Sequence, residues 1–310
     1  MAARPLFVVG CHRSGTTLTR RILSTHPEVW LAKETQYLAF LPLADGDWHR
    51  PRTADALREH LGWIRPFLVS TGWGTLPERY PDHAEPTWAG VYQWVCGLEA
   101  PPGKAVRWWG DNTPRYVSLI PELDRAFPGA RYIHVVRDPR DVVRSTLDVW
   151  FGGNTALTAA EEWMERVGAG LAAERLVGDR LLVVRFEDLL RDTAPTLARI
   201  ARFLEVDDAF RANDTGQDAA AVASAHAHLA NVGKPLDASV IGQYRAGLTP
   251  AQIAEVEQLT QPFLRALGYE LDQWQPAWNP TPRFRRFAWH YLRSFATNLW
   301  RGLTRRLRRA

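Results

Sequence analysis

Short apolar runs, each followed by a stretch with helical spacing, constrain the fold of this 310-residue chain most strongly. The first run covers residues 6–9 and ends at Gly10, and apolar residues then recur at helical spacing up to Ser24. The later runs are residues 106–109, 132–136 and 181–184, and the helices expected after them are residues 115–126, 138–149 and 188–204. Buried strands that alternate with helices are typical of a parallel sheet with helices on both faces. We therefore predict one α/β domain over residues 1–272.

The alternation of strands and helices lapses between residues 30 and 105. Helical spacing near residues 54–69 and 87–98 predicts a helical insertion over the sheet, placed after the first strand–helix unit. Eight of the 14 tryptophans fall between Trp30 and Trp109. Their rings suit core packing, which we favour, and also stacking on a sugar or a phenol.

A glycine-containing loop joins the first expected strand to the first expected helix. Gly10 and Gly15 have the G-x4-G spacing of a P-loop, but Thr16 stands where that loop carries lysine. Backbone N–H groups at a helix N-terminus bind anions, and Arg13 would add a cation from inside the loop. The missing lysine disfavours triphosphate hydrolysis and predicts another phosphate-bearing ligand. The alternatives are a turn without a ligand and the degenerate loop of a nucleotide kinase or NTPase.

A second candidate phosphate site follows the strand expected at residues 132–136. Arg137 lies at the end of this strand, and Ser145 follows eight residues later. A fixed guanidinium group together with a hydroxyl group suits a phosphate. Two alternatives remain: Arg137 and Asp138 form a helix-capping ion pair, or Asp138 acts as a Walker-B carboxylate.

These two segments resemble those of sulfotransferases that use 3′-phosphoadenosine 5′-phosphosulfate (PAPS), especially the tyrosylprotein and bacterial carbohydrate-type members. The first resembles the family's 5′-phosphosulfate loop, whose residues here are Arg13, Ser14, Gly15, Thr16 and Thr17. The second, Arg137 with Ser145, resembles the family's 3′-phosphate site. Lys234 resembles a late lysine that reaches over the nucleotide, although an exposed loop lysine is the alternative. The family has a further arginine where this chain has Val149, and Arg140 and Arg144 are candidates to replace it.

The resemblance implies a P-loop-like fold and a PAPS-dependent enzyme, with PAPS as co-substrate. It also implies that the insertion, residues 30–105, lies on the side of a hydroxyl-bearing acceptor. The acceptor class stays open among carbohydrate, tyrosine, lipid and small molecule. Transfer of a sulfuryl group needs positioned donors and a base, and it requires no metal.

Glu34 is the predicted base, and Arg13 is the predicted catalytic cation. Glu34 lies 21 residues after Arg13, in a Glu-Thr context similar to that of the catalytic glutamate of the tyrosylprotein enzymes. The alternatives are a surface ion pair between Glu34 and Lys33, and His12 as the base. Asn112 departs from the family, because many relatives carry a lysine there. This substitution leaves open a catalytically inactive scaffold at a membrane surface.

The charge of the chain changes abruptly at Asp272. Nine arginines and no acidic residue follow it, so residues 1–272 carry −5 although the whole chain carries +4. Residues 273–282 form a proline-rich linker, and residues 283–309 have the pattern of a basic amphipathic helix. Such a helix suits an anionic membrane surface, with packing on the body as the alternative and nucleic acid excluded by the large apolar face. Two cysteines and the lack of a leader or membrane span predict a cytoplasmic protein, peripheral at the inner face of the membrane.

Overall fold

Five strands in the described part of the chain form one parallel sheet in the order β2-β3-β1-β4-β5. The computed structural model describes residues 3–40, 47–70, 73, 80–81, 84–149, 151–212 and 236–272. The strands are β1 (Arg4–Gly10), β2 (Val29–Ala32), β3 (Trp108–Asp111), β4 (Arg131–Val136) and β5 (Leu181–Arg185). This sheet confirms the predicted α/β fold.

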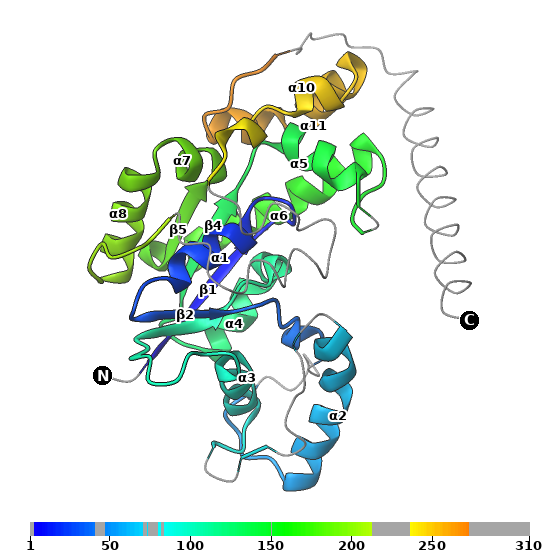
Figure 1. Cartoon of the computed structure of the whole chain (residues 1–310). Coiled ribbons are helices and arrows are strands. Elements are labelled where there is room, and N and C mark those ends of the chain that lie inside the picture. Colours follow the sequence, from blue (N-terminus) through cyan, green and yellow to red (C-terminus); the bar gives the residue numbers. More distant parts are fainter. Residues whose placement is uncertain are drawn as a thin grey trace.

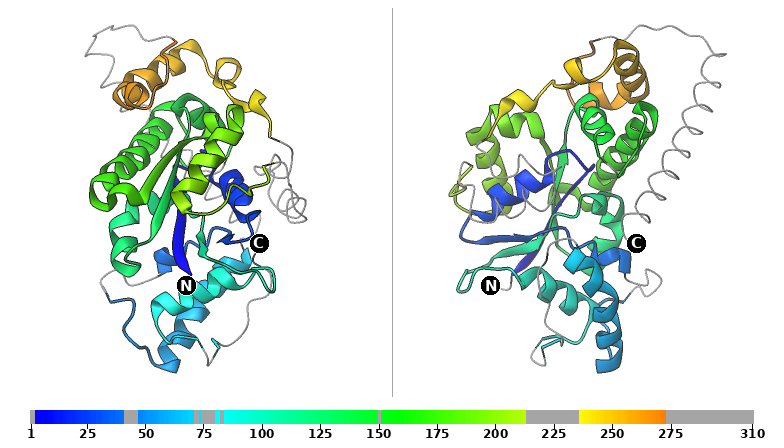
Figure 2. Two further views of the ribbon diagram at one scale, coloured as in Figure 1. Left: turned by 90° about the vertical axis from the view of Figure 1, so that its left-hand side faces the viewer. Right: turned by 45° about the vertical axis from the view of Figure 1, so that its right-hand side comes forward.

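Helices cover both faces of the sheet because β1 is apolar on both sides. Leu6 and Val8 face one layer, and Phe7 and Val9 face the other. Figures 1 and 2 show helices on both sides of the sheet. The first layer contains α1 (Thr16–Ser24), α7 (Phe186–Arg191) and α8 (Thr193–Leu204). The second contains α3 (Trp88–Gly97), α4 (Ile120–Ala126) and α6 (Ala156–Val177). The sheet is therefore buried on both sides, as parallel sheets require.

Further helices lie at the two ends of the sheet in the view of Figure 1. Helix α2 (Ala54–Ser70) lies at the end near α3, and α10 (Tyr244–Gly247) and α11 (Pro250–Ala266) lie at the other end. Thr249 begins α11 with a capping box to Gln252, which explains its sharp start. Helix α5 (Pro139–Leu147) packs on both α6 and α11, so it connects α11 with a helix that covers the sheet.

The structure differs from the sequence-based expectation in several places. Strand β2 (Val29–Ala32) occupies the first residues of the predicted insertion, 30–105, so the helical insertion begins only after Ala32. Helix α6 was not predicted, because its buried stripe consists largely of alanine and glycine. Two expected helices are broken: residues 114–119 form the 3₁₀ helix η2 (Pro114–Leu119) before α4, and Asp192 separates α7 from α8.

The tryptophans of the first 109 residues belong mostly to the core. The buried ones are Trp30, Trp48, Trp73, Trp88, Trp108 and Trp109. Trp63, on α2, is 68% exposed. Core packing, the favoured interpretation, is confirmed for the buried rings.

Several predictions fall on residues outside the described ranges. These are the role of Lys234, the linker at 273–282 and the basic amphipathic helix at 283–309. Within the residues that are described, no helix is both long and apolar enough to cross a membrane.

Candidate active site

The carboxyl ends of β1 and β4 form the switch point of the sheet. The chain leaves β1 toward β2 on one side and leaves β4 toward β5 on the other. Ligands of open α/β sheets bind at such points. Because Gly10 is paired with Val135, the loop after β1 lies beside Arg137, which follows the end of β4. The fold thus brings the two predicted phosphate segments together (Figure 1).

The loop between β1 and α1 needs glycine at both of its ends. A Cβ atom at Gly10 would lie 2.4 Å from the carbonyl oxygen of Val135. Gly15 has φ +93°, and a Cβ atom there would lie 2.2 Å from the ring of Phe186. Helix α1 begins directly afterwards at Thr16, which is buried, while Thr17 is half-buried. The positive end of α1 therefore adjoins a tightly packed loop.

Replacing Gly15 by alanine should destabilise the protein by about 2 kcal/mol or more, because the side chain meets Phe186 in a left-handed conformation. The same change at Gly62 provides the control. Gly62 lies within α2, and a Cβ atom there meets nothing within 4 Å. Urea denaturation should show a lower free energy of unfolding for Gly15→Ala and a slightly higher one for Gly62→Ala. Equal stability of the two variants would contradict the packing of Phe186 on the loop.

Arg13, Arg137 and Ser145 form one connected cluster. Arg13 Nε donates a hydrogen bond of 2.9 Å to Ser145 Oγ. Arg137 Nη1 donates to the carbonyl oxygen of Arg13 at 3.2 Å, and Nη2 donates to that of Val240 at 2.9 Å. Arg137 also lies over the ring of Phe186, with its guanidinium carbon 4.9 Å from the ring centroid. The residues predicted for two phosphate groups thus lie in direct contact.

The two guanidinium groups of this cluster are half-buried and close together. Burial, and then the charge of Arg137, lower the pKa of Arg13. Ser14 Oγ and Arg137 Nε are buried and have no hydrogen-bond partner within the described residues. Buried polar groups in proteins are normally satisfied, and unsatisfied donors beside positive charge suit an anionic ligand. The cluster therefore has the chemistry of a phosphate site.

His12, the alternative base, is engaged with α5 and α6. Its Nδ1 atom lies 3.4 Å from Glu162 Oε1, and its Nε2 atom lies 3.4 Å from Thr146 Oγ1. Burial lowers the pKa of His12, while the charge of Glu162 opposes this shift. These contacts indicate that His12 supports the loop.

Asp138 caps α5 and is bound by Arg140. Its Oδ1 atom accepts from the backbone N–H and from Nε of Arg140, both at 2.9 Å, and Oδ2 accepts from Nη2 at 2.7 Å. A capping ion pair is therefore present, but its cation is Arg140 and not Arg137. Arg140 is buried and also bonds Glu257 at 2.5 Å, and these contacts disfavour it as the replacement for the arginine missing at Val149.

Arg144, the other candidate to replace that arginine, forms an ion pair of 3.4 Å with Asp148. Its side chain is 37% exposed, and it lies on the same helix as Ser145. Among the described residues, no group of three or more His, Cys, Asp or Glu side chains is placed to hold a metal ion.

Glu34 lies two residues beyond the end of β2, beside the carboxyl end of β3. Burial, reinforced by the negative charge of Asp111, raises the pKa of Glu34 to about 7. Gln36 donates a hydrogen bond of 3.4 Å to Glu34 Oε2. Lys33 is bonded to Glu99 at 2.9 Å, which weakens the interpretation of Glu34 as the surface partner of Lys33. A carboxyl group with a pKa near 7 suits a general base at neutral pH.

The residues that hold Glu34 in place were not predicted from the sequence. Asp111 is fully buried and accepts hydrogen bonds from Thr35 and Thr113. Its neighbour Asn112 is 1% exposed, and Asn112 Oδ1 has no hydrogen-bond partner among the described residues. Asp111 could have been identified from its position in the sequence, as an acidic residue at the end of an apolar strand and directly before Asn112.

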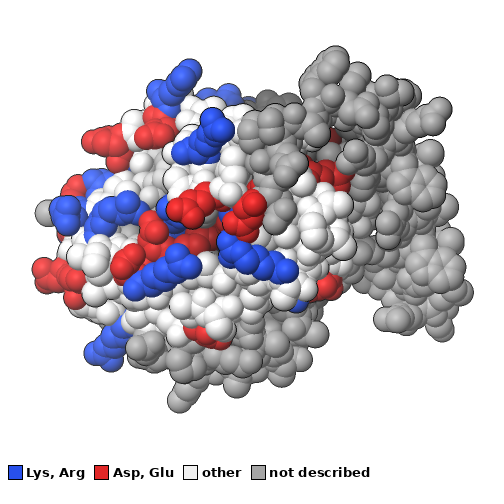
Figure 3. Space-filling view, turned by 90° about the horizontal axis from the view of Figure 1, so that it is seen from above, with Lys and Arg blue, Asp and Glu red and all other residues white. Residues whose placement is uncertain are grey.

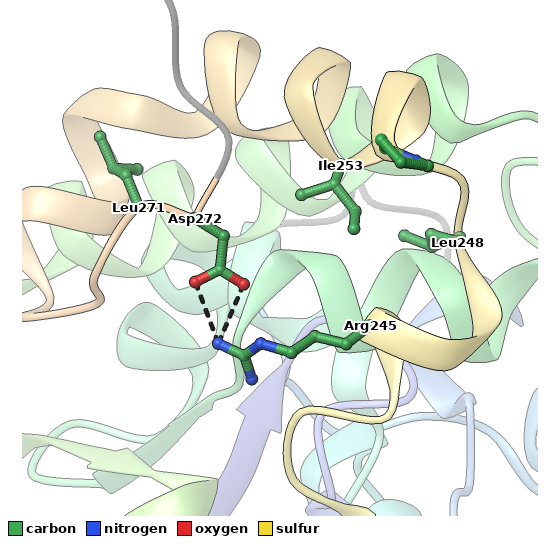
Figure 4. Close-up of a pocket in the computed structure, with 6 residues that line it drawn as sticks. Arg245, Leu248, Ile253, Leu271 and Asp272 are labelled. Carbon is green, nitrogen blue, oxygen red and sulfur yellow. Dashed lines mark hydrogen bonds and ion pairs between the residues drawn. The ribbon is translucent and has the colours of Figure 1, made fainter.

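A hollow of about 540 Å³ lies between α10 and α11 (Figure 4). Its lining residues are Arg245, Leu248, Pro250, Ile253, Leu271 and Asp272. Arg245 is ion-paired with Asp272 across it at 2.9 Å. No predicted site residue lines this hollow. Seen from above, the described surface carries acidic and basic side chains side by side (Figure 3).

The sheet order and the glycine loop between β1 and α1 define an α/β protein of the P-loop type. The chain belongs to the sulfotransferase family, since the profile described as "Sulfotransferase family" matches residues 5–210. Protein-tyrosine sulfotransferase 1 of Danio rerio is 22% identical over 275 residues, which cover 86% of this chain and 72% of that protein. The Drosophila melanogaster protein-tyrosine sulfotransferase is 22% identical over 295 residues, and the match covers 92% of this chain but 54% of that protein.

Two solved structures share the fold. The sulfotransferase domain of a Synechococcus olefin synthase gives a TM-score of 0.54 at 24% identity, covering 87% of this chain and 96% of that chain. The sulfotransferase domain from the curacin biosynthetic pathway gives a TM-score of 0.53 at 18% identity, covering 87% and 99%. Both confirm the fold class predicted from the sequence.

Proposed function

We propose that this protein transfers the sulfuryl group of PAPS to the hydroxyl group of an acceptor, with Glu34 as the base. The observation that carries the proposal is the contact of Arg13 with both Ser145 and Arg137. This contact joins two phosphate segments into one site, as a nucleotide with phosphates at both its 3′ and 5′ positions requires. Membership of the sulfotransferase family supports PAPS as that nucleotide.

In this proposal the loop holds the 5′-phosphosulfate and the end of β4 holds the 3′-phosphate. The loop residues are Arg13, Ser14, Gly15, Thr16 and Thr17. Arg137 and Ser145 bind the 3′-phosphate, and Lys234 covers the nucleotide. The unpartnered Ser14 hydroxyl and Arg137 Nε fit this assignment, because each offers a donor to a phosphate or sulfonate oxygen.

The reaction forms a bond between the acceptor oxygen and sulfur while the bond from sulfur to the phosphate oxygen breaks. Glu34 takes the proton of the acceptor hydroxyl, and 3′-phosphoadenosine 5′-phosphate (PAP) is the leaving group. Transfers of this kind pass through a loose transition state, so the protein acts mainly by positioning and by stabilising charge. Because Asn112 carries no positive charge, the leaving phosphate depends on Arg13 and on the loop N–H groups.

Thermal unfolding with PAP, ADP and AMP tests the donor site. Saturating PAP should raise the melting temperature by about 5 °C without added metal, because a ligand at 100 times its Kd adds about 2.7 kcal/mol. ADP and AMP lack the 3′-phosphate and should raise it much less. A larger increase of the melting temperature with ADP and Mg²⁺ than with PAP would instead support a nucleotide kinase or NTPase.

The acceptor is tested by the release of PAP from PAPS with peptidyl tyrosine, carbohydrate, lipid and small-molecule alcohols. The proposal predicts turnover with at least one of these classes. The protein-tyrosine sulfotransferases among the relatives make peptidyl tyrosine the first to assay. Tight binding of PAP with no turnover in any class would favour an inactive scaffold.

A further inference from the structure

The carboxylate of Asp111 is buried at the carboxyl end of β3, beside the segment that carries Glu34. Asp111 is paired with Ala32 in the sheet and is 0% exposed. Its Oδ2 atom accepts from the backbone N–H of Thr35 at 3.2 Å, from Thr113 Oγ1 at 2.8 Å and from Thr35 Oγ1. Its Oδ1 atom accepts from the backbone N–H of Thr113 at 3.2 Å. Both oxygens are thus engaged, and two of these bonds reach the residue after Glu34.

Side chains satisfy the backbone N–H groups that follow Glu34, up to the first turn of the 3₁₀ helix η1 (Tyr37–Phe40). The N–H of Gln36 donates to Thr113 Oγ1, that of Tyr37 to Thr35 Oγ1, and that of Leu38 to the hydroxyl of Tyr116, at 3.1 to 3.2 Å. Gln36 has φ +49°, a conformation that is costly for residues other than glycine. Such a turn persists only when its surroundings hold it. Asp111 is the acceptor on which these bonds converge, through Thr35 and Thr113.

We propose that Asp111 is the positioning residue of the base: it fixes the turn at residues 35–38 and thereby the direction and the electrostatic surroundings of the Glu34 carboxyl. This inference rests on the proposed function, in which Glu34 receives the proton of the acceptor. Asp111 itself contacts no reacting atom in this assignment. It acts through Thr35 and through its charge.

The charged surroundings of Glu34 come from three elements. Asp111 at the end of β3 disfavours the ionised form of Glu34, after burial as the largest cause. Arg20 on α1 and the amide of Gln36 act in the opposite direction and favour it. On α3, Tyr92 and Cys96 lie near Asp111, and burial raises the pKa of both, so they stay neutral. Removing the charge of Asp111 should therefore ease the ionisation of Glu34.

Asp111→Asn is the direct test, because asparagine keeps the shape and removes the charge. Because the base acts only when it is ionised, the rate falls at low pH, and this fall is the acidic limb of the pH–rate profile. At saturating PAPS and at pH values above this limb, the substitution should lower kcat by about 10- to 100-fold, the loss typical of a displaced reacting group. The acidic limb should move down by about one pH unit, because a neighbouring like charge is gone. The Kd for PAP should stay within about twofold, since the substitution does not contact the phosphate cluster, which consists of Arg13, Arg137 and Ser145.

Thr35→Val and Thr35→Ser provide a matched pair if Asp111→Asn does not fold. Valine removes the hydroxyl that bonds Asp111 at nearly equal volume, whereas serine keeps it. The value of kcat should fall in Thr35→Val and should stay close to that of the wild type in Thr35→Ser. Glu257→Gln is the control for a buried carboxylate elsewhere, because Glu257 is 0% exposed and bonds Arg140; it should lower the melting temperature without moving the acidic limb.

A plateau rate within about twofold of the wild type in both Asp111→Asn and Thr35→Val would overturn the proposal. The proposal would also be overturned if kcat fell while the acidic limb stayed at its wild-type pH, or if the affinity for PAP fell in parallel with kcat. Either result would indicate a general structural defect. Failure of the proposed function looks different: the wild-type protein would not bind PAP, or would bind it without turnover in any acceptor class. NMR titration of ¹³C-labelled glutamate, assigned with Glu34→Gln, would then still report whether Asp111 controls the ionisation of Glu34.

Discussion

Replacing Glu34 by glutamine should lower the rate of sulfuryl transfer by about 10²- to 10⁴-fold, the range that general acid–base catalysis contributes. Glutamine retains the size of the side chain but cannot take the proton of an acceptor hydroxyl. Binding of PAP should stay within about twofold, because the hydrogen bonds that join Arg13 to Ser145 and Arg137 to Arg13 do not involve Glu34. Steady-state kinetics and calorimetric titration with PAP separate the two effects.

The pH dependence of kcat/KM should identify the same group. The pKa of Glu34 is raised to about 7, and the base acts in its deprotonated form. The rate should therefore fall about tenfold for each pH unit below 7 and level off above it. In Glu34→Gln this limb should disappear from the residual rate.

Glu99→Gln is the matched control for Glu34→Gln. Glu99 is also partly buried and bonds Lys33, the residue next to Glu34, at 2.9 Å. Its replacement changes the charge nearby without touching the base, so kcat/KM should stay within about threefold with the same limb. A wild-type rate in Glu34→Gln, or a limb that survives in it, would remove Glu34 from the mechanism. His12 would then be the next candidate.

The fold was predictable from the sequence wherever apolar strands and amphipathic helices follow one another. Strands β1, β4 and β5 and helices α1 and α5 begin and end close to the predicted positions. Each has a local cause, such as the apolar run before Gly10. Strand β2 was missed because four residues give too short a pattern to recognise. Its hydrogen bonds with β3 decide its conformation, and these are not local.

The phosphate cluster was predictable for the same reason, because parallel strand ends meet at one edge of a sheet. Arg13 and Arg137 each follow a predicted strand, so their proximity needs only the strand order. The support of Glu34 was not predictable, since Thr35 and Asp111 are separated by 76 positions and meet only through the pairing of β2 with β3. The buried contact of Arg140 was not predictable for a related reason, since its partner Glu257 lies on α11, far along the chain.

Replacing Arg137 by glutamine should abolish the preference for PAP over ADP. The affinity for PAP should fall on the order of 10- to 100-fold, the cost of losing hydrogen bonds to a charged group. The affinity for ADP should change much less, because the 3′-phosphate is the group that Arg137 contacts in the proposed complex. Calorimetric titration of both nucleotides in wild type and variant measures this discrimination directly.

Arg144→Gln tests whether the effect of Arg137→Gln is specific or reflects lost positive charge. Arg144 lies on the same helix as Ser145 and pairs with Asp148, and 37% of its side chain is exposed. An exposed charge acts through water and is screened by salt, so its loss should weaken both nucleotides alike and by about twofold at most. The phosphate-binding role proposed for Arg137 depends instead on a fixed position, held by its bonds to the carbonyl oxygens of Arg13 and Val240. A retained preference for PAP in Arg137→Gln would therefore place the 3′-phosphate elsewhere. Losses of equal size in the two variants that affect PAP and not ADP would assign Arg144 to the same phosphate site.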